Sequence, residues 1–365
     1  MRVAIINSIR AYGGGEKWVL RAAAGLRARG AAVTVICAPE SDLERRCREA
    51  SIESHPVLLR HDVSPSAVLG LAGALRKLAP QVAICCNERA ARIGALSARL
   101  LPRQVPLVYR NGLEGSFKNR AHNRLLVNPR IARYVTNSVA VRDELLAFGW
   151  ISSERVKVIY NGVDPAPVEG ADPSGVREEL GAGAEDLVAL TAARMVPEKG
   201  HALLLDVAAE LIPRFPRLQI WLAGEGPETE GLQARSEAPP LKGHVRFLGF
   251  RTDVPRLLRA ADLLVHPSRR EGAPNVVLEA MVAGLPVVGV AAPGTAELVR
   301  EGQEGLLAPI GDRDGLRARL EAVLADEGLR RRLGEAGRQR ARTEFTEERS
   351  ADRWLALLEE VKADG

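Results

Sequence analysis

The sequence predicts an α/β protein of two doubly wound domains, each built on a parallel sheet with helices on both faces. Short runs rich in Val, Ile and Leu alternate with helical patterns along the whole chain, which is typical of βαβ units. At 365 residues the chain exceeds the size at which one hydrophobic core usually keeps growing. The stretch NGVDPAPVEGADPSG at 161–175 divides the β-rich runs into two series and is typical of an interdomain linker. We therefore expect domains at 1–165 and 166–345, followed by a C-terminal helix at 346–365.

The expected strands are short apolar runs bounded by turn residues. In the first domain they lie at 2–6, 33–37, 82–86, 106–110, 133–137 and 156–160, and in the second at 187–193, 219–224, 245–249, 262–266, 286–290 and 305–309. The tail from 329 to 364 is helical and charged in pattern, with Trp354, Leu357 and Leu358 on one face. Such a helix either crosses back to the first domain or simply ends the chain, and the sequence favours neither arrangement.

The composition predicts a globular protein of the cytoplasm. Apolar residues make up 46% of the chain and charged residues 27%, and we expect neither a membrane-spanning segment nor a signal peptide. The cysteines Cys37, Cys47, Cys85 and Cys86 show no C-x-x-C spacing, so we expect reduced thiols. The six histidines show no metal-binding spacing, and we expect no protein-held metal.

Charge is distributed unevenly along the chain. Residues 1–165 hold 25 Lys and Arg against 13 Asp and Glu, whereas the remainder is acidic. Within 99–133 eight basic side chains stand with one acid, Glu114. This segment is either a solvated face or a surface for an anionic partner, such as a phospholipid membrane or a phosphorylated acceptor.

Three glycines at 13–15 follow the first strand and precede a helix that should begin near Glu16 and end at Gly30. Glycine lets backbone amides approach a ligand, and a helix N-terminus favours an anion. The spacing is neither G-x-G-x-x-G nor that of a P-loop. Gly14 and Gly15 therefore indicate either a phosphate site or only a tight turn.

Arg194 falls at the end of an expected strand, and Lys199 stands just before the next helix. Ligands of open α/β sheets bind outside such strand ends, and two cations on either side of a strand–helix turn can hold a diphosphate. Gly224 and Gly226 follow the next strand and should mark a turn near the ligand.

The stretch EGAPNVVLE combines two carboxylates, Glu271 and Glu279, with a helix expected to begin near Asn275 and to end at Gly284. The amides of Asn275, Val276 and Val277 would form its N-terminus, which is a second anion site. Glu279 lies on a helix that is otherwise apolar, and the run itself supplies no partner. A ligand rich in hydroxyl groups would satisfy such a carboxylate.

These residues resemble the E-x7-E signature of retaining glycosyltransferases with the GT-B fold, in particular glycosyltransferase family 4. The similarity extends over nearly the whole chain, because other motifs follow in the expected order. They are GGGE at 13–16, NGVD at 161–164, RMVPEKG at 194–200, AGEGPE at 223–228, VRFLGF at 245–250, ADLLVHPS at 261–268 and EAMVAGLPVV at 279–288.

The resemblance implies transfer of a sugar from a nucleotide diphosphate donor, a UDP- or GDP-sugar, to an acceptor hydroxyl with retention at the anomeric carbon. It assigns the neutralisation of the leaving diphosphate to Arg194 and Lys199. Glu271 would bind hydroxyls of the transferred sugar, helped by the amides after Gly272, and Glu279 would bind the donor ribose. No covalent cofactor is implied, and two cations can serve without a metal.

Other donor contacts implied by the resemblance come from both domains. Gly14 and Gly15 would bring their amides to the phosphates, Gly224 would mark the turn beside them, and the strand end Gly249, Phe250 and Arg251 would meet the base. We expect the acceptor on the basic first domain, and infer a glycan, glycolipid or lipid-linked acceptor at the membrane's inner face, with no nucleic acid. The acceptor-side residues would be Arg110, Asn111, Lys118, Arg120, His122 and Arg124.

One position departs from the family pattern. Many relatives carry a His where this chain has Asn111, and Asn can bind a hydroxyl but cannot act as a base at neutral pH. His122 either substitutes for it or binds acceptor. Two alternatives to transfer therefore stay open, a non-catalytic nucleotide-sugar-binding module and a GT-B nucleotide-sugar epimerase. A phosphorylase or a dinucleotide oxidoreductase is disfavoured, because neither motif set is present.

Overall fold

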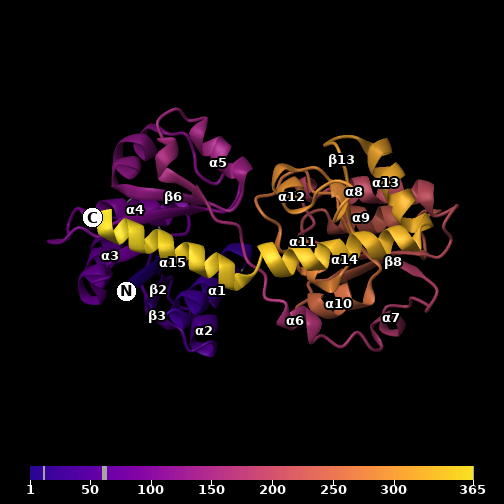
Figure 1. Cartoon of the computed structure of the whole chain (residues 1–365), viewed down its shortest axis with the longest axis horizontal. Helices are drawn as coiled ribbons and strands as arrows, with labels where there is room; N and C mark the ends of the chain where they lie inside the picture. The colour runs from indigo at the N-terminus through magenta and orange to yellow at the C-terminus, as the bar shows by residue number, and fades with distance from the viewer. Residues whose placement is uncertain (11–12, 60–63, 365) are drawn as a thin grey trace. The chain divides into compact units, whose positions relative to one another are not determined.

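The computed structural model describes residues 1–10, 13–59 and 64–364, and the chain divides into two compact units (Figure 1). Unit 1 comprises Met1–Gly162 together with Glu347–Gly365, and unit 2 comprises Val163–Thr346. The chain therefore leaves unit 1 after residue 162 and returns to it after residue 346. Each unit has its own sheet and its own core.

Unit 1 is built on a seven-stranded parallel sheet in the order β3-β2-β1-β4-β5-β6-β7. The strands are β1 Arg2–Ile6, β2 Ala32–Cys37, β3 Glu53–Pro56, β4 Val82–Cys85, β5 Leu107–Asn111, β6 Ile131–Thr136 and β7 Val156–Val158. The strand order reverses beside β1, which pairs with β2 on one side and with β4 on the other. In an open sheet of this kind, ligands bind at such a switch point, outside the carboxyl ends of the strands.

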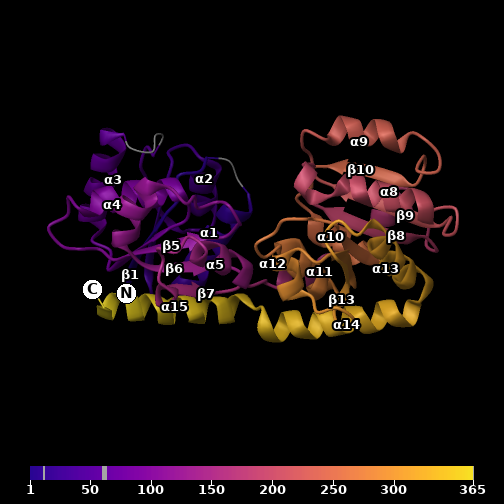
Figure 2. The ribbon, with the colours of Figure 1, turned by 90° about the horizontal axis from the view of Figure 1, so that it is seen from above.

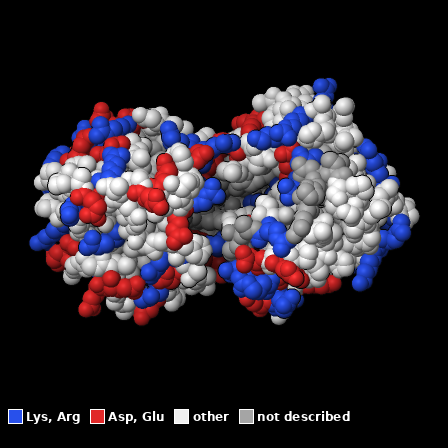
Figure 3. Space-filling view, turned by 180° about the vertical axis from the view of Figure 1, so that it is seen from behind, with Lys and Arg blue, Asp and Glu red and all other residues white. Residues whose placement is uncertain are grey.

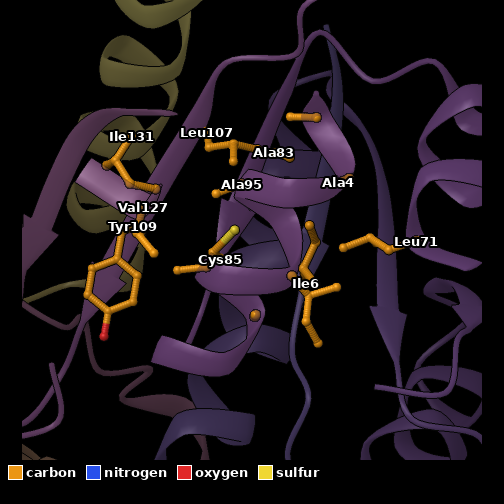
Figure 4. Close-up of a cluster of buried hydrophobic side chains, with 14 of the residues drawn as sticks. Ala4, Ile6, Leu71, Ala83, Cys85, Ala95, Leu107, Tyr109, Val127 and Ile131 are labelled. Carbon is orange, nitrogen blue, oxygen red and sulfur yellow. The ribbon is translucent and has the colours of Figure 1, made fainter. Parts of the chain in front are cut away.

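The α-helices of unit 1 cover both faces of the sheet, as the alternation of buried residues along β1 requires. Val3 and Ile5 pack in one buried cluster, whereas Ala4 and Ile6 pack in the other. Figure 4 shows the second cluster, in which Leu71 lies beside Ile6. The helices are α1 Gly14–Ala28, α2 Asp42–Glu49, α3 Pro65–Leu78, α4 Glu88–Ala98, α5 Val139–Leu146 and α15 Glu347–Asp364, with short helical turns at Asn123–Val127, Asn128–Arg130 and Ser153–Arg155.

The last helix, α15, packs against α1 within unit 1 (Figures 1 and 2). The rings of Trp354 and Trp18 lie 5.1 Å apart, centroid to centroid. A Cβ at Gly25 would lie 2.8 Å from the Cβ of Ala351, so the two helices approach closely there. The helix therefore crosses back to the first domain, and the predicted apolar face of Trp354, Leu357 and Leu358 is buried.

Unit 2 is built on a six-stranded parallel sheet in the order β10-β9-β8-β11-β12-β13 (Figure 2). The strands are β8 Leu187–Ala192, β9 Leu218–Ala223, β10 Val245–Gly249, β11 Leu263–His266, β12 Val287–Val290 and β13 Gly305–Ala308. The order reverses between β8 and β11, which defines a second switch point. The helices are α6 Ala166–Glu169, α7 Val176–Glu179, a 3-10 turn Pro197–Lys199, α8 His201–Leu211, α9 Thr229–Ser236, α10 Val254–Ala260, α11 Asn275–Ala283, α12 Pro293–Leu298, α13 Arg313–Ala325 and α14 Glu327–Glu344.

The structure differs from the sequence prediction in two elements. Strand β3 was not predicted. The segment expected to be a linker at 161–175 is largely part of unit 2, because Val163 and Val168 are buried and the N–H of Val163 donates to Phe345 O at 2.8 Å. Pro and Gly in this segment bound the short helices α6 and α7 and do not indicate a free connector.

Candidate functional site

The loops that follow β8, β9 and β11 meet at the carboxyl edge of the sheet of unit 2. The N–H of Met195 donates to Glu225 O at 2.9 Å, and the N–H of Arg269 donates to Glu198 O at 2.8 Å. Glycine allows this contact, because a Cβ at Gly224 would lie 2.0 Å from Ala193 O and one at Gly226 would lie 2.2 Å from Met195 O. The predicted turn at 224–226 therefore lies directly beside the loop that carries Arg194.

Lys199 and Glu271 form an ion pair at this edge. Nζ of Lys199 lies 2.5 Å from Oε1 of Glu271, and Nε2 of His266 lies 3.1 Å from the same oxygen, although its direction is not that of a hydrogen bond. The carboxylate is buried. Burial alone would raise the pKa of Glu271, but the contacts with His266 and Lys199 outweigh it and lower the pKa to about 2. Glu271 is therefore ionised at neutral pH, and Lys199 is an ion-paired ammonium rather than an isolated cation.

A second histidine, His201, lies at the start of α8 beside this cluster. It is fully buried, and neither ring nitrogen has a hydrogen-bond partner among the residues that the structure describes. Burial, together with the weaker electrostatic effects of Lys199 and His266, lowers the pKa of His201 to about 4. The ring is therefore neutral at pH 7. Sequence reasoning identified neither His201 nor His266 as a site residue, although His201 directly follows RMVPEKG and His266 is the histidine of ADLLVHPS.

Arg194 is the open cation of the pair predicted from sequence. Its side chain is exposed and forms no ion pair or hydrogen bond with any residue that the structure describes. The structure thus gives the two predicted cations different environments. Arg194 can bind an anion directly from solvent, whereas an anion that binds Lys199 must lie next to the carboxylate of Glu271.

Helix α11 begins and ends where the sequence predicts, with Pro274 before its first residue and Gly284 in the left-handed conformation after its last. No side chain caps its N-terminus. The N–H of Val277 donates to Pro274 O at 3.2 Å, within the first turn of the helix. Asn275 also has an interaction within the protein, and the anion site formed by the amides of Asn275, Val276 and Val277 stays a prediction.

Glu279 is half-buried on α11 and has an interaction within the protein. The carboxylate therefore has an interaction before any ligand binds, and its contact with the donor ribose stays a prediction. Gly272 is held closely by the chain around it, because a Cβ at Gly294 would lie 1.7 Å from Gly272 O. Helix α12 can approach the loop after Glu271 only with glycine at 294.

The strand end at 249–251 combines an engaged cation with an exposed ring. Gly249 O accepts from the N–H of Gly224 at 2.7 Å, which joins this strand end to the loop after β9. Arg251 is bound to Asp253 at 2.7 Å and to Glu179 at 3.3 Å, so its guanidinium is already paired. The ring of Phe250, in contrast, is 73% exposed.

In unit 1 the glycine-rich turn is capped by a carboxylate of the chain itself. Glu16 accepts from the N–H of Gly13 and from Nδ2 of Asn7, each at 3.0 Å. A Cβ at Gly14 or Gly15 would meet no atom within 4 Å, so packing does not require glycine there. The helix N-terminus that was predicted to favour a phosphate therefore already lies beside a negative charge.

The predicted acceptor-side residues separate into buried and exposed groups. Arg110 and Asn111 are buried at the end of β5, whereas Lys118, Arg120 and Arg124 are exposed. His122 is half-buried, with Nε2 3.3 Å from Nη1 of Arg92. Figure 3 shows basic and acidic side chains intermingled over one face of the molecule.

No group of three or more His, Cys, Asp or Glu side chains is arranged to hold a metal ion among the residues that the structure describes. Within the same residues, no helix combines the length and apolar character that crossing a membrane requires.

Comparisons with known proteins agree with this architecture. Among curated proteins, the chain is similar to the lipopolysaccharide core biosynthesis glycosyltransferase LpsE of Rhizobium meliloti, with 32% identity over 61% of this chain and 63% of LpsE. It is also similar to a phosphatidyl-myo-inositol mannosyltransferase of Mycolicibacterium smegmatis, with 34% identity over 55% of this chain and 50% of that protein. The matched region thus spans between half and two thirds of these relatives.

Among solved structures, HepE of Anabaena in complex with UDP and glucose superposes with a TM-score of 0.86, at 24% identity over 99% of this chain and 100% of HepE. This likeness shows the fold, which is the GT-B fold. A family model for Glycosyltransferase Family 4 matches residues 12–167, and one for Glycosyl transferases group 1 matches residues 175–340. The first model matches most of unit 1 and the second matches most of unit 2. The chain therefore belongs to the family 4, group 1 glycosyltransferases of GT-B fold.

Proposed function

We propose that this protein transfers a sugar from a nucleotide diphosphate donor, a UDP- or GDP-sugar, to an acceptor hydroxyl with retention of anomeric configuration. The observation that carries the proposal is the Lys199–Glu271 ion pair at the carboxyl edge of unit 2, with the open cation Arg194 on the same loop as Lys199. This arrangement offers one ligand a carboxylate that can accept hydrogen bonds from hydroxyl groups, together with positive charge. A nucleotide diphosphate sugar has hydroxyl groups for the carboxylate and negative charge for the cations.

The roles of these groups follow from where charge develops. As the glycosidic bond of the donor breaks, negative charge grows on the leaving diphosphate, and preorganised positive groups stabilise it. Arg194 would contact the diphosphate from the solvent side, while Lys199 keeps two N–H donors beyond the one given to Glu271. The ionised Glu271 can accept hydrogen bonds from sugar hydroxyls.

Further donor contacts are proposed for the loops around this pair. The exposed ring of Phe250 supplies an apolar face for a base, because aromatic rings favour stacked arrangements. The amide of Val276 at the uncapped start of α11 and the carboxylate of Glu279 on the same helix would contact the sugar and the ribose. Because two cations already serve the diphosphate, we propose that the reaction needs no metal.

For the acceptor we propose a glycan, glycolipid or lipid-linked molecule, bound by unit 1 at the inner face of the cell membrane. LpsE acts in lipopolysaccharide core biosynthesis by its name, and the mycobacterial relative is named for a phosphatidylinositol lipid. In support, Leu113, Leu125 and Leu126 are exposed in the same segment as the basic Lys118 and Arg124. Apolar side chains among basic ones favour contact with an anionic lipid surface.

Calorimetric titration with UDP, GDP and ADP tests the donor half of the proposal. We expect one of UDP and GDP to bind, in EDTA, at least about tenfold tighter than the others. Glu279→Gln should weaken that binding, whereas Glu335→Gln on the exposed face of α14 is the matched control and should leave it unchanged. If none of the three nucleotides binds, the proposal is contradicted.

Co-sedimentation with vesicles tests the membrane half. Vesicles with anionic phospholipid should retain the protein at low salt, and vesicles of neutral phospholipid should not. Neutralising Lys118, Arg120, Arg124 and Arg130 together should release it. Equal retention of the wild type on both kinds of vesicle would contradict a role for the basic segment.

A further inference from the structure

Arg110 is a buried guanidinium without a carboxylate partner. The residue is 7% exposed at the end of β5, and among the described residues no acidic side chain pairs with it. Its one hydrogen bond runs from Nη2 to Oδ1 of Asn161 and is long, at 3.4 Å. The guanidinium carbon lies 4.2 Å from the ring centroid of Trp18, so a ring face covers one side of it.

The carboxylate with the largest electrostatic influence on Arg110, that of Glu16, is occupied elsewhere. Its two oxygens accept from Asn7 and from Gly13. Burial lowers the pKa of Arg110 to about 10, against weaker opposing effects of Cys86, Tyr109 and Glu16. The group therefore stays charged at pH 7, and burying an unpaired charge is costly. The planar guanidinium of Arg110 can donate two parallel N–H hydrogen bonds. A carboxylate or a phosphate can accept both of them.

The backbone after β5 is shaped around the guanidinium. A Cβ at Gly112 would lie 2.6 Å from Nη1 of Arg110, so glycine at 112 leaves room for the side chain to fold back over the chain. The same glycine is linked to the next strand, because Nδ2 of Asn137 donates to Gly112 O at 3.0 Å. The end of β5 and the residue after β6 are thereby held together beside the charge.

Two buried amide side chains, each with one atom that lacks a hydrogen-bond partner, lie at the ends of the strands beside the guanidinium. Asn111 is 1% exposed and Asn137 is 3% exposed. Oδ1 of Asn111 accepts from Ser116, but within the described part of the chain its Nδ2 has no partner, and Oδ1 of Asn137 has none either. Buried polar atoms are rarely left unsatisfied. One donor and one acceptor at the ends of neighbouring strands match a hydroxyl group, which can accept from the first and donate to the second.

We propose that Arg110, Asn111 and Asn137 form a subsite in unit 1 for an oxyanion carried by a hydroxylated ligand, with the carboxylate or phosphate on Arg110 and a hydroxyl on the two amides. This subsite rests on the proposed function and makes it more specific. It names an acidic or phosphorylated sugar as the class of substrate. The oxyanion comes either from such an acceptor or from the donor diphosphate, and the two sources can be distinguished by competition.

The test is a calorimetric titration with three probes, glucose 6-phosphate, glucuronate and glucose. At least one charged probe should bind the wild type about tenfold or more tighter than glucose. Arg110→Gln should remove this preference and Arg110→Lys should keep part of it, because lysine retains charge without the fork. Arg76→Gln, an exposed arginine of α3, is the matched control and should behave as wild type.

Two results would overturn the subsite. One is that neither charged probe binds the wild type more tightly than glucose, and the other is that Arg110→Gln keeps the preference. If Arg110→Gln does not fold, as judged by its melting curve, Gly112→Ala serves instead, since it keeps the charge but displaces the guanidinium. It should also remove the preference, and its failure to do so overturns the proposal.

A saturating concentration of UDP then identifies the source of the oxyanion. If UDP displaces the charged probe, the subsite holds the donor diphosphate, and if the probe still binds, it holds an acidic acceptor. Either result supports the subsite. Failure of the proposed transfer would be seen separately, as an absence of nucleotide binding and of donor cleavage while the charged probes still bind.

Discussion

Nζ of Lys199 donates to Oε1 of Glu271 across 2.5 Å and so joins the loop after β8 to the loop after β11. These strands are neighbours in the sheet of unit 2, at the point where the strand order reverses. The ion pair holds the carboxylate ionised and fixes the ammonium beside it. In our account, this preorganisation allows the same two groups to bind a sugar and to stabilise its departing diphosphate.

Replacing Lys199 by Met should lower kcat by about a hundredfold or more, because one preorganised charge at the leaving group is lost. Lys199→Arg should retain part of the rate, because it retains charge at that position. The measurement is the steady-state rate of donor consumption. Lys242→Met, which removes an exposed lysine of unit 2, is the control and should stay within about threefold of wild type. Similar rates for the Met variants at 199 and 242 would contradict the role.

Glu271 should contribute to stability only above acid pH. Its pKa is lowered from 4.5 to about 2, so the stabilisation is complete above pH 4.5 and is lost as pH falls toward 2. The full effect is on the order of 3 kcal/mol. Urea unfolding at pH 6, 4 and 3 should show the difference in free energy of unfolding between wild type and Glu271→Gln shrinking as pH falls. A difference that stays constant over this range would contradict the shift.

His201 should also make the fold sensitive to acid, in a higher pH window. Its pKa is lowered from 6.5 to about 4, so between these values the unfolded state binds a proton that the folded state does not. Stability should therefore fall as pH decreases from 6.5 to 4. The slope of unfolding free energy against pH should be smaller in His201→Leu. An unchanged slope would mean that the ring titrates normally.

Gly200→Ala should destabilise unit 2 more than the same change elsewhere. Gly200 has φ +72°, and its added Cβ would lie 2.2 Å from Pro267 O, which would force apart the loops carrying Lys199 and Glu271. Gly302→Ala is the matched control, since Gly302 has φ +76° but open space around it. The control should cost about 1 kcal/mol from backbone strain alone, and Gly200→Ala about 2 kcal/mol more. Equal midpoints in urea would contradict the contact.

Trp354→Ala should destabilise unit 1 although the residue lies near the end of the chain. Its ring is 2% exposed against Trp18, and truncating a large buried aromatic costs about 3–5 kcal/mol. Arg353→Ala, which changes the exposed neighbour on the same helix, should have little effect. Thermal melting compares the two. If both variants melt together, α15 does not support the core of unit 1.

Most of the fold could be predicted from the sequence, because both sheets are parallel and covered on both faces. Strands such as β1 and β9 are therefore near-continuous apolar runs, interrupted only by Arg2 and Gln219, that local pattern reveals. Strand β3 was not predicted because its sequence, ESHP at Glu53–Pro56, contains no aliphatic residue. It is an edge strand that pairs only with β2, so its position depends on a neighbour and not on its own side chains.

The sequence pattern singles out Lys199 and Glu271, but it does not predict that they form an ion pair. Lys199 and Glu271 stand 72 positions apart, and nothing local to either shows that the two loops meet. Arg110 was expected on the basic acceptor side, whereas Trp18 and Gly112 enclose it. Contacts between distant segments account for each of these differences.

The most direct test of the account is proton NMR of the reaction with UDP-, GDP- and ADP-sugars in EDTA, using wild type and Lys199→Met. We predict that one donor is consumed by the wild type, that the first product keeps the anomeric configuration of the donor, and that Lys199→Met consumes the same donor about a hundredfold more slowly. A first product of inverted configuration, or no donor consumed unless a divalent metal is added, would contradict the retaining, metal-independent transfer proposed for this protein.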